Sequence, residues 1–320
     1  MKICLYSPYF PKHIGGGEKY FLDVAFALSR HGEVFLSVSE EELGKEEEIY
    51  ERYEKFLGKS IRSFKLIGSP LHSEKASFWH KLFWTKQFDL LYAFTDGSFF
   101  PSLAHRNVLH IQTPLKRAPL SFWERCKFYS WNFVNTNSFF TKNVVEKFWK
   151  IPVNAVHHPT FDVEGLENLQ KEYTKEKIIL HVGRFFRKLH SKRQDILTQF
   201  FKELVQKFPQ KIKNWKLVLI GSVEDEDYAQ EIRSLAEGFP IEVIHTVSRK
   251  ELNTWYARAS IYWHATGFGL DENEQPEKME HFGISTGEAM AAGASPVVIH
   301  SGGQPEVLGK ELAPWLWDNK

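Results

Sequence analysis

The sequence predicts an α/β protein with two domains, each built around a parallel β-sheet. Its 320 residues suffice for about two domains of ~150 residues with separate cores. Short apolar runs rich in β-forming residues alternate with longer helical patterns along the chain, which is typical of strands joined by helical crossovers. One charged, strand-poor stretch interrupts this alternation and is typical of a linker. We therefore expect a first domain at 1–157, a linker at 158–177 and a second domain at 178–320.

Each expected element follows from a local pattern. In the first domain a strand at 2–7 precedes a glycine loop and a helix that ends near Gly32, because apolar residues there recur at helical spacing. A final helix at 138–150 has Ser138 as its expected N-cap. Between these lie an acidic helix at 41–58 and further strands at 33–38, 62–68, 88–94, 107–112 and 133–137. In the second domain the strands are expected at 178–183, 216–221, 241–246, 261–266 and 295–300.

The composition excludes several classes of protein. Hydrophobic residues make up 42% of the chain and charged residues 25%, as in ordinary globular proteins rather than disordered ones. Cys4 and Cys126 are too few for a disulfide framework or a thiolate metal site, and they suit a reducing cytoplasm. The N-terminus turns polar too early for a signal peptide, and no run of 18 apolar residues indicates a membrane span. We expect a cytoplasmic protein.

A basic, aromatic region lies at 75–133. Residues 61–150 hold 13 Lys and Arg against 5 Asp and Glu, although the whole chain carries only +1. Tryptophan and phenylalanine are interleaved with these cations at 77–86 and 115–133. Such a surface can lie on an anionic membrane or, less favoured here, bind nucleic acid. The alternative is a pair of amphipathic helices that bury their aromatic rings and leave the lysines in solvent.

Three loops at expected strand ends could bind phosphate. The first is "HIGGGEKYF" (13–21), whose glycines let backbone N–H groups approach an anion at a helix start. Gly15 and Gly17 begin a dinucleotide fingerprint, but Tyr20 stands where its third glycine belongs, so a nicotinamide cofactor is disfavoured. The P-loop ending of Lys and Ser or Thr is also missing. A plain tight turn is the alternative.

The second loop is "HVGRFFRKLHSKRQD" (181–195). Arg184 is expected at the end of a strand and Lys192 at the start of the next helix. Two fixed cations at such a junction suit a diphosphate whose ester bond breaks. The alternative is a solvated basic loop.

The third is "EHFGISTGE" (280–288), before "AMAAG". Ser285 and Glu288 match a capping box, which accounts for Glu288 without any ligand. It does not account for Glu280 or Gly283, five and two residues before that cap. Backbone N–H groups at 283–286 could instead hold an anion at the helix start.

Together these motifs resemble glycosyltransferase family 4, the retaining nucleotide-sugar transferases of the GT-B fold. The resemblance rests on "GGGE", "GR" with its later lysine, the Glu-x7-Glu pair followed by "AMAAG", and "GGQPE" (302–306), in that order. The version "WHATGFG…EHFGI" is similar to a branch with mannosyltransferases of lipid-linked oligosaccharides and polysaccharides. The resemblance to the family covers nearly the whole chain, and its motifs are more specific in the second half. It implies two Rossmann-like domains that face each other across a cleft, acceptor on the first and donor on the second.

The resemblance also implies roles for single residues. Arg184 and Lys192 would neutralise the leaving diphosphate, Glu280 would hold hydroxyl groups of the donor sugar, and His110 or Gln112 would contact that sugar. Glu288 would accept hydrogen bonds from the ribose. The remaining nucleotide-sugar contacts would be made by the backbone of Gly15, Gly16, Thr246, Val247, Phe282, Gly283 and Ile284.

The implied partners are a GDP- or UDP-sugar donor and a glycan or lipid-linked acceptor, without nucleic acid. No metal and no organic cofactor are expected, and the enzyme would be cytoplasmic, with peripheral contact to the inner face of the membrane. Two departures stand out: Gln112 and Pro114 flank Thr113 where the family often has His-Thr-Pro, and the chain ends at "APWLWDNK" without the expected terminal crossover helix. The alternatives are a non-catalytic sugar-nucleotide-binding protein and a GT-B enzyme of another class, such as an epimerase or a phosphorylase.

Overall fold

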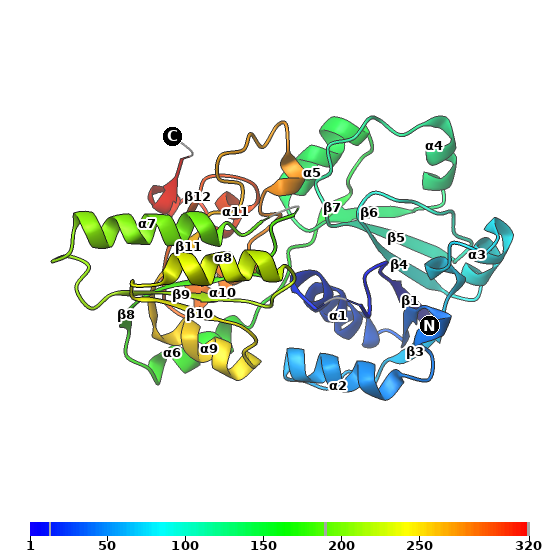
Figure 1. Cartoon of the computed structure of the whole chain (residues 1–320). Helices are drawn as coiled ribbons and strands as arrows, with labels where there is room; N and C mark the ends of the chain where they lie inside the picture. The colour runs from blue at the N-terminus through cyan, green and yellow to red at the C-terminus, as the bar shows by residue number, and fades with distance from the viewer. Residues whose placement is uncertain (13, 189–190, 319–320) are drawn as a thin grey trace. The chain divides into compact units, whose positions relative to one another are not determined.

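A computed structural model describes residues 1–12, 14–188 and 191–318 of the chain (Figure 1). The chain divides into two compact units, Met1–Thr160 and Phe161–Lys320. Each unit contains one sheet in which the paired strands of the described residues are parallel. The expected class of two Rossmann-like α/β domains is therefore confirmed, and the cleft between them remains a prediction.

The first unit has its sheet in the order β3-β2-β1-β4-β5-β6-β7. The strands are β1 (Lys2–Tyr6), β2 (Glu33–Val38), β3 (Lys65–Gly68), β4 (Leu90–Thr95), β5 (Arg106–Ile111), β6 (Phe133–Thr136) and β7 (Ala155–Val156). The helices are α1 (Gly16–Ser29), α2 (Glu46–Leu57), α3 (Phe78–Thr85), α4 (Phe122–Phe128) and α5 (Phe139–Val144), the last continued by a π-helical turn at Val145–Trp149. Ser138 caps α5 as expected, accepting a hydrogen bond from Thr141 N at 3.0 Å.

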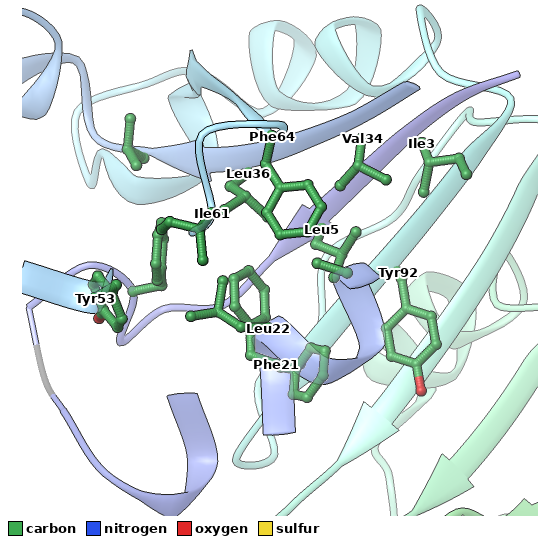
Figure 2. Packing of buried hydrophobic residues seen from close by; sticks show 14 of the residues in the cluster. Ile3, Leu5, Phe21, Leu22, Val34, Leu36, Tyr53, Ile61, Phe64 and Tyr92 are labelled. Carbon is green, nitrogen blue, oxygen red and sulfur yellow. The ribbon is translucent and has the colours of Figure 1, made fainter. Parts of the chain in front are cut away.

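Apolar side chains cover both faces of this sheet. Figure 2 shows one face, where Phe21 and Leu22 of α1 and Tyr53 of α2 pack on Leu5 and Leu36 of the sheet. The opposite face holds a second cluster, to which the helices and loops after β3 contribute. Successive side chains of a strand point to opposite faces, and here both faces are covered. The strands of this unit are therefore nearly continuous apolar runs in the sequence.

The second unit has its sheet in the order β10-β9-β8-β11-β12-β13. The strands are β8 (Glu176–Val182), β9 (Lys216–Ile220), β10 (Ile241–Ile244), β11 (Ala259–His264), β12 (Ser295–Ile299) and β13 (Leu316–Trp317). The helices are α6 (Val163–Lys171), α7 (Gln194–Lys207), α8 (Glu226–Ala236), α9 (Arg249–Arg258), α10 (Ile284–Ala291) and α11 (Gln304–Leu308). Phe201 of α7 and Ile232 of α8 pack on one face, and α6, α9 and α10 contribute to the core on the other (Figure 1).

The stretch 158–177 differs from the linker expected there. It contains α6, whose Leu166 is 1% exposed and belongs to the core of the second unit. Asp162 caps this helix by accepting a hydrogen bond from Gly165 N at 2.9 Å. The helix was missed because its charged residues dominate the sequence, while a single buried leucine places it in the core beside α9 and α10.

Candidate functional site

The carboxyl edge of the second sheet gathers three polar residues from distant segments. Lys192 precedes α7, His264 ends β11, and Glu280 lies in the loop before α10. Lys192 Nζ lies 2.6 Å from Glu280 Oε2, and His264 Nε2 lies 2.9 Å from the same oxygen. Among the described residues Oε1 of Glu280 has no such partner, so this oxygen can accept a hydrogen bond from a ligand hydroxyl.

The charge state of this cluster follows from its surroundings. Burial disfavours charge on Glu280, but the ammonium of Lys192 and the hydrogen bond from His264 outweigh it and hold the pKa of Glu280 well below its usual value. Burial lowers the pKa of His264 despite the adjacent carboxylate, so its imidazole is neutral and donates from Nε2. The cluster therefore holds one fixed anion and one fixed cation.

Gly183 makes room for Lys192 to reach this position. A Cβ atom at Gly183 would lie 2.7 Å from Lys192 Cγ, closer than carbon atoms approach without displacement. The glycine of the "HVGR" motif is thus required by the path of the lysine stem across the end of β8.

Arg184 lies next in the chain and is held by a different carboxylate. Its Nη1 donates to both oxygens of Glu224, each at 3.0 Å. Burial lowers the pKa of His281, and the charges of Lys192 and Arg184 add to this effect, so both cations act on the same loop. The two basic residues expected from the sequence therefore converge, and both already face carboxylates.

Glu288 does not form the capping box that the sequence offered as an alternative. The N-cap of α10 is Gly283, at φ 115°, with no side-chain cap. The helix thus begins before Ser285, whose Oγ accepts a hydrogen bond from Tyr262 Oη at 2.7 Å. Glu288, with its side chain 4% exposed, accepts from Arg249 Nη2 at 2.6 Å. The capping-box interpretation is wrong because the left-handed glycine starts the helix two residues early.

The first turn of α10 has no side-chain cap for its backbone N–H groups. Gly303 N donates to Glu280 O at 2.7 Å and fixes the preceding loop. The fully buried Gln304 side chain lies against Gly283, and neither of its amide atoms has a hydrogen-bond partner among the described residues. Phe282, just before the N-cap, is 8% exposed. Uncapped N–H groups at a helix N-terminus bind anions.

The segment with Thr246 and Val247, expected to contact the nucleotide sugar, follows β10. Thr246 adopts a left-handed backbone conformation at φ 58°, which is unusual for threonine, and it is exposed. Val247 packs against the core of the second unit. The next residue, Ser248, caps α9 in a capping box with Glu251. A capping box thus begins α9 and not α10, where the sequence offered one. Arg249 is the first residue of that helix, which links the loop to Glu288.

The first unit holds the remaining candidates. Gly15 is the N-cap of α1, and Gly16 is the first residue of that helix, with no side-chain cap. A Cβ atom at Gly17 would lie 3.1 Å from Gln112 Oε1, so Gln112 lies against the glycine loop. His110 is a core residue.

His110 is fully buried between aromatic rings of α1 and β4. Its Nδ1 lies 2.8 Å from Asn135 Oδ1, and its ring contacts those of Tyr20 and Phe94. Burial lowers its pKa to about 3. Of the two residues that the sequence offered for contact with the sugar, only Gln112 is accessible, and the interpretation of His110 as a ligand contact is not supported by its position.

Sequence reasoning missed three polar residues of the site. His264, Glu224 and Arg249 each contact a residue that the motifs identified. His264 could have been found from its place at the end of an expected strand, and Arg249 from its place in a first helical turn, where a cation is unfavourable unless an anion faces it. No sequence signal identifies Glu224. Within 1–12, 14–188 and 191–318, no group of three or more His, Cys, Asp or Glu side chains could hold a metal ion.

Comparison with known proteins gives three results. A family model described as glycosyl transferases group 1 matches residues 165–320. The chain is 28% identical over 190 residues to a GDP-Man:Man(3)GlcNAc(2)-PP-Dol alpha-1,2-mannosyltransferase of Dictyostelium discoideum, covering 54% of this chain and 35% of that protein. It is 25% identical over 247 residues to the alpha-1,3/1,6-mannosyltransferase alg-2 of Neurospora crassa, covering 64% of this chain and 48% of that protein. The chain thus spans about a third to a half of the length of these curated relatives.

Solved structures share the fold. A glycosyltransferase from Rickettsia africae superposes with a TM-score of 0.61 at 13% identity, covering 95% of this chain and 80% of that one. WaaG, a glycosyltransferase involved in lipopolysaccharide biosynthesis, superposes with a TM-score of 0.57 at 14% identity, covering 98% and 83%. At such identities the likeness concerns the fold, which is that of GT-B glycosyltransferases.

Proposed function

Through residues 165–320 the chain belongs to the glycosyl transferases group 1, and from this premise we propose that it is a retaining glycosyltransferase. It would move a hexose from a GDP- or UDP-sugar to a glycan or lipid-linked acceptor. The observation that carries the proposal is the cluster of Lys192, His264 and Glu280, which places a fixed cation, a fixed anion and the uncapped start of α10 at one sheet edge.

Each part of the cluster suits one part of a sugar nucleotide. Lys192 and Arg184 would neutralise the diphosphate as its charge grows, and the backbone of Phe282, Gly283 and Ile284 would donate to its oxygens. Glu280 would accept from sugar hydroxyl groups through Oε1. Since Glu280 and Glu288 both act in binding, they are not the acid and nucleophile pair of a glycosidase.

The donor nucleotide would lie along two elements, the loop that follows β10 and the helix α10. The backbone of Thr246 and Val247 would contact the base. Glu288 would accept hydrogen bonds from the ribose hydroxyl groups through the carboxylate oxygen that does not bind Arg249. In the first unit Gly15 and Gly16 would approach the transferred sugar, beside Gln112. These residue roles are part of the proposal.

In the proposed reaction the bond between the anomeric carbon and the diphosphate breaks while the acceptor oxygen bonds to that carbon on the same face. The acceptor proton passes to an oxygen of the departing phosphate. Positive charge on the sugar ring is balanced by that phosphate, whose negative charge Lys192 and Arg184 stabilise. We propose that transfer needs no metal ion, because these two cations supply the charge that the leaving group requires.

The relatives support a choice of donor. Their names specify GDP-Man for the Dictyostelium protein and mannosyl transfer for alg-2, and we propose GDP-mannose as the first donor to test. A lipid-linked acceptor, suggested by the dolichyl diphosphate in the first name, would place the enzyme at a membrane surface. Two free cysteines are consistent with a reducing compartment, and we propose peripheral attachment on the cytoplasmic side.

The deciding experiment incubates the protein with GDP- and UDP-sugars and lipid-linked acceptors, with and without EDTA, and follows nucleotide release and the anomeric configuration of the product by NMR. We expect release with one donor, retained configuration and no loss with EDTA. Binding of a sugar nucleotide without release, across these acceptors, would favour the binding-protein alternative, whereas an altered sugar without transfer would favour an epimerase. Glu280→Gln is the matched variant, because it keeps the shape and removes the charge that Lys192 faces.

A further inference from the structure

Two helices of the first unit present aromatic side chains to solvent. Phe78, Trp79 and Phe83 of α3 are 50, 63 and 58% exposed, and Phe122 and Trp123 of α4 are 71 and 74% exposed. The sequence left open whether the rings of this basic region are buried, and these five are not. Their exposure matters because an aromatic ring left in water forgoes the free energy that its burial would contribute.

The exposure is a property of folded helices rather than of loose segments. Ser77 caps α3 and Ser121 caps α4 with a capping box. Each helix is also fixed to the core by an inward ring, since Trp84 packs against Phe88 with centroids 5.0 Å apart, and Phe128 belongs to the same apolar cluster. The helices thus have an inner aromatic face, which is partly buried in the core, and an outer aromatic face, which is exposed.

The ends of the two helices meet at one short loop. Leu103 N donates to Thr85 Oγ1 at the end of α3 (2.8 Å), and Ser102 N donates to Ser130 Oγ just beyond α4 (3.1 Å). Leu103 is itself 43% exposed. Figure 1 shows α3 and α4 at the same end of the first unit. We call the resulting patch the aromatic surface: Phe78, Trp79, Phe83, Leu103, Phe122, Trp123 and Tyr129.

The aromatic surface concentrates the exposed apolar side chains of the protein. Among the described residues, thirteen large hydrophobic side chains are exposed, and seven of them lie between positions 78 and 129. Scattered exposed hydrophobic residues need no explanation, whereas several exposed rings gathered on two helices at one end of a unit indicate an interaction site. The binding partner must therefore offer an apolar layer.

The charges around the aromatic surface identify that partner. Residues 74–87 and 115–130 contain seven Lys and Arg and two Glu. One of these glutamates, Glu124, is paired with Arg117, which leaves the excess positive. Tryptophan and tyrosine prefer the boundary between head groups and acyl chains, and lysine and arginine are attracted to anionic head groups. None of the helices in the described part of the chain is long and apolar enough to cross a membrane.

We propose that the aromatic surface inserts into the interfacial layer of an anionic lipid bilayer and holds the protein there without spanning it. The rings of Trp79, Phe83 and Trp123 enter the boundary of the acyl chains, and Lys81 and Lys127 contact phosphate head groups. This deepens the proposed function, because it gives an enzyme with a lipid-linked acceptor a way to meet that acceptor at the membrane. A protein partner is the competing occupant, and it does not require lipid charge.

The test measures vesicle binding of the full chain without any donor. Vesicles of phosphatidylcholine alone are compared with vesicles that also contain phosphatidylglycerol, by co-sedimentation and by tryptophan fluorescence. We expect binding to the anionic vesicles, and a loss of about tenfold or more in affinity for the double variant Trp79→Ser, Trp123→Ser, since two interfacial anchors are removed. Lys81→Glu with Lys127→Glu should also weaken binding, most strongly at low salt.

Matched controls come from exposed rings elsewhere. Phe139 is 53% exposed and Phe208 is 47% exposed, and neither belongs to the aromatic surface. Phe139→Ser and Phe208→Ser should keep wild-type vesicle affinity. If the wild type binds neither kind of vesicle, or the double tryptophan variant binds as tightly as the wild type, the proposal is overturned. Because no donor is present, vesicle binding by a protein that transfers no sugar would overturn the proposed function and leave this surface standing.

Discussion

Arg249 Nη2 lies 2.6 Å from Glu288 Oε1 and joins the first turn of α9 to the middle of α10. Burial disfavours the charged guanidinium, but the carboxylate of Glu288 more than offsets this and raises the pKa of Arg249. The pair therefore fixes the loop at Thr246 and Val247 against the helix whose N-terminus is proposed to hold phosphate. Two elements far apart in the sequence are thus held together where a nucleotide would bind.

We expect Glu288→Gln to weaken nucleotide binding by roughly 1–3 kcal/mol, the usual cost of an unpaired buried polar partner. The cost has two sources, a lost acceptor for the ribose and an Arg249 without its anion. Titration calorimetry with GDP measures the affinity, and urea unfolding measures the stability. Glu251→Gln is the control, because its capping box tolerates glutamine and it lies on α9. Lower stability with unchanged GDP affinity would assign Glu288 a structural role only.

Arg184→Ala should reduce turnover more than donor affinity, because negative charge on the diphosphate grows as the sugar leaves. A loss of about 10²–10³-fold in kcat is the expected scale for removing one stabilising group. The matched control is Arg187→Ala, which removes a cation of the same loop that pairs with Glu231 at the surface. Equal losses in kcat and in affinity would contradict a role specific to the transition state.

His264→Leu should weaken binding of GDP-mannose more than binding of GDP. His264 donates a hydrogen bond to Glu280, which is proposed to hold the sugar of the donor. Free GDP has no sugar at this position, so its binding should not depend on this hydrogen bond. We expect about a tenfold loss for the sugar nucleotide, equal to ~1.4 kcal/mol, and rescue by His264→Gln, which keeps an N–H donor. Equal weakening of both ligands, or no rescue by glutamine, would show that His264 does not position Glu280.

Acid should destabilise the fold through buried histidines. Burial lowers the pKa of His110 and of His181 to about 3 each, so both are neutral in the folded state. Between pH ~6.5 and ~3 the unfolded chain binds more protons there than the folded chain, and stability falls as the pH falls through this range. Each histidine steepens the dependence by up to about 1.4 kcal/mol per pH unit.

Urea unfolding at several pH values tests this dependence. His110→Gln keeps a hydrogen-bonding side chain beside Asn135 and removes the titrating group, so its stability should change less between pH 7 and pH 5 than that of the wild type. His31→Gln, at an exposed position, is the control. A variant with the slope of the wild type would show that His110 does not contribute.

The sequence by itself determined the α/β class, two parallel sheets, most strands within a residue or two, and the motifs that hold Arg184, Lys192 and Glu280. These follow from local periodicity and from glycine and charge at strand ends, which short windows of sequence record. The tertiary structure decided that Lys192 and His264 share one oxygen of Glu280, that Glu288 faces Arg249 rather than its own helix start, and that His110 is buried while Trp79 and Trp123 are exposed. The physical reason is that the partner and the burial of a side chain depend on which segments pack together across a sheet. Lys192 and Glu280 are 88 positions apart, and no short window of sequence shows that they are in contact.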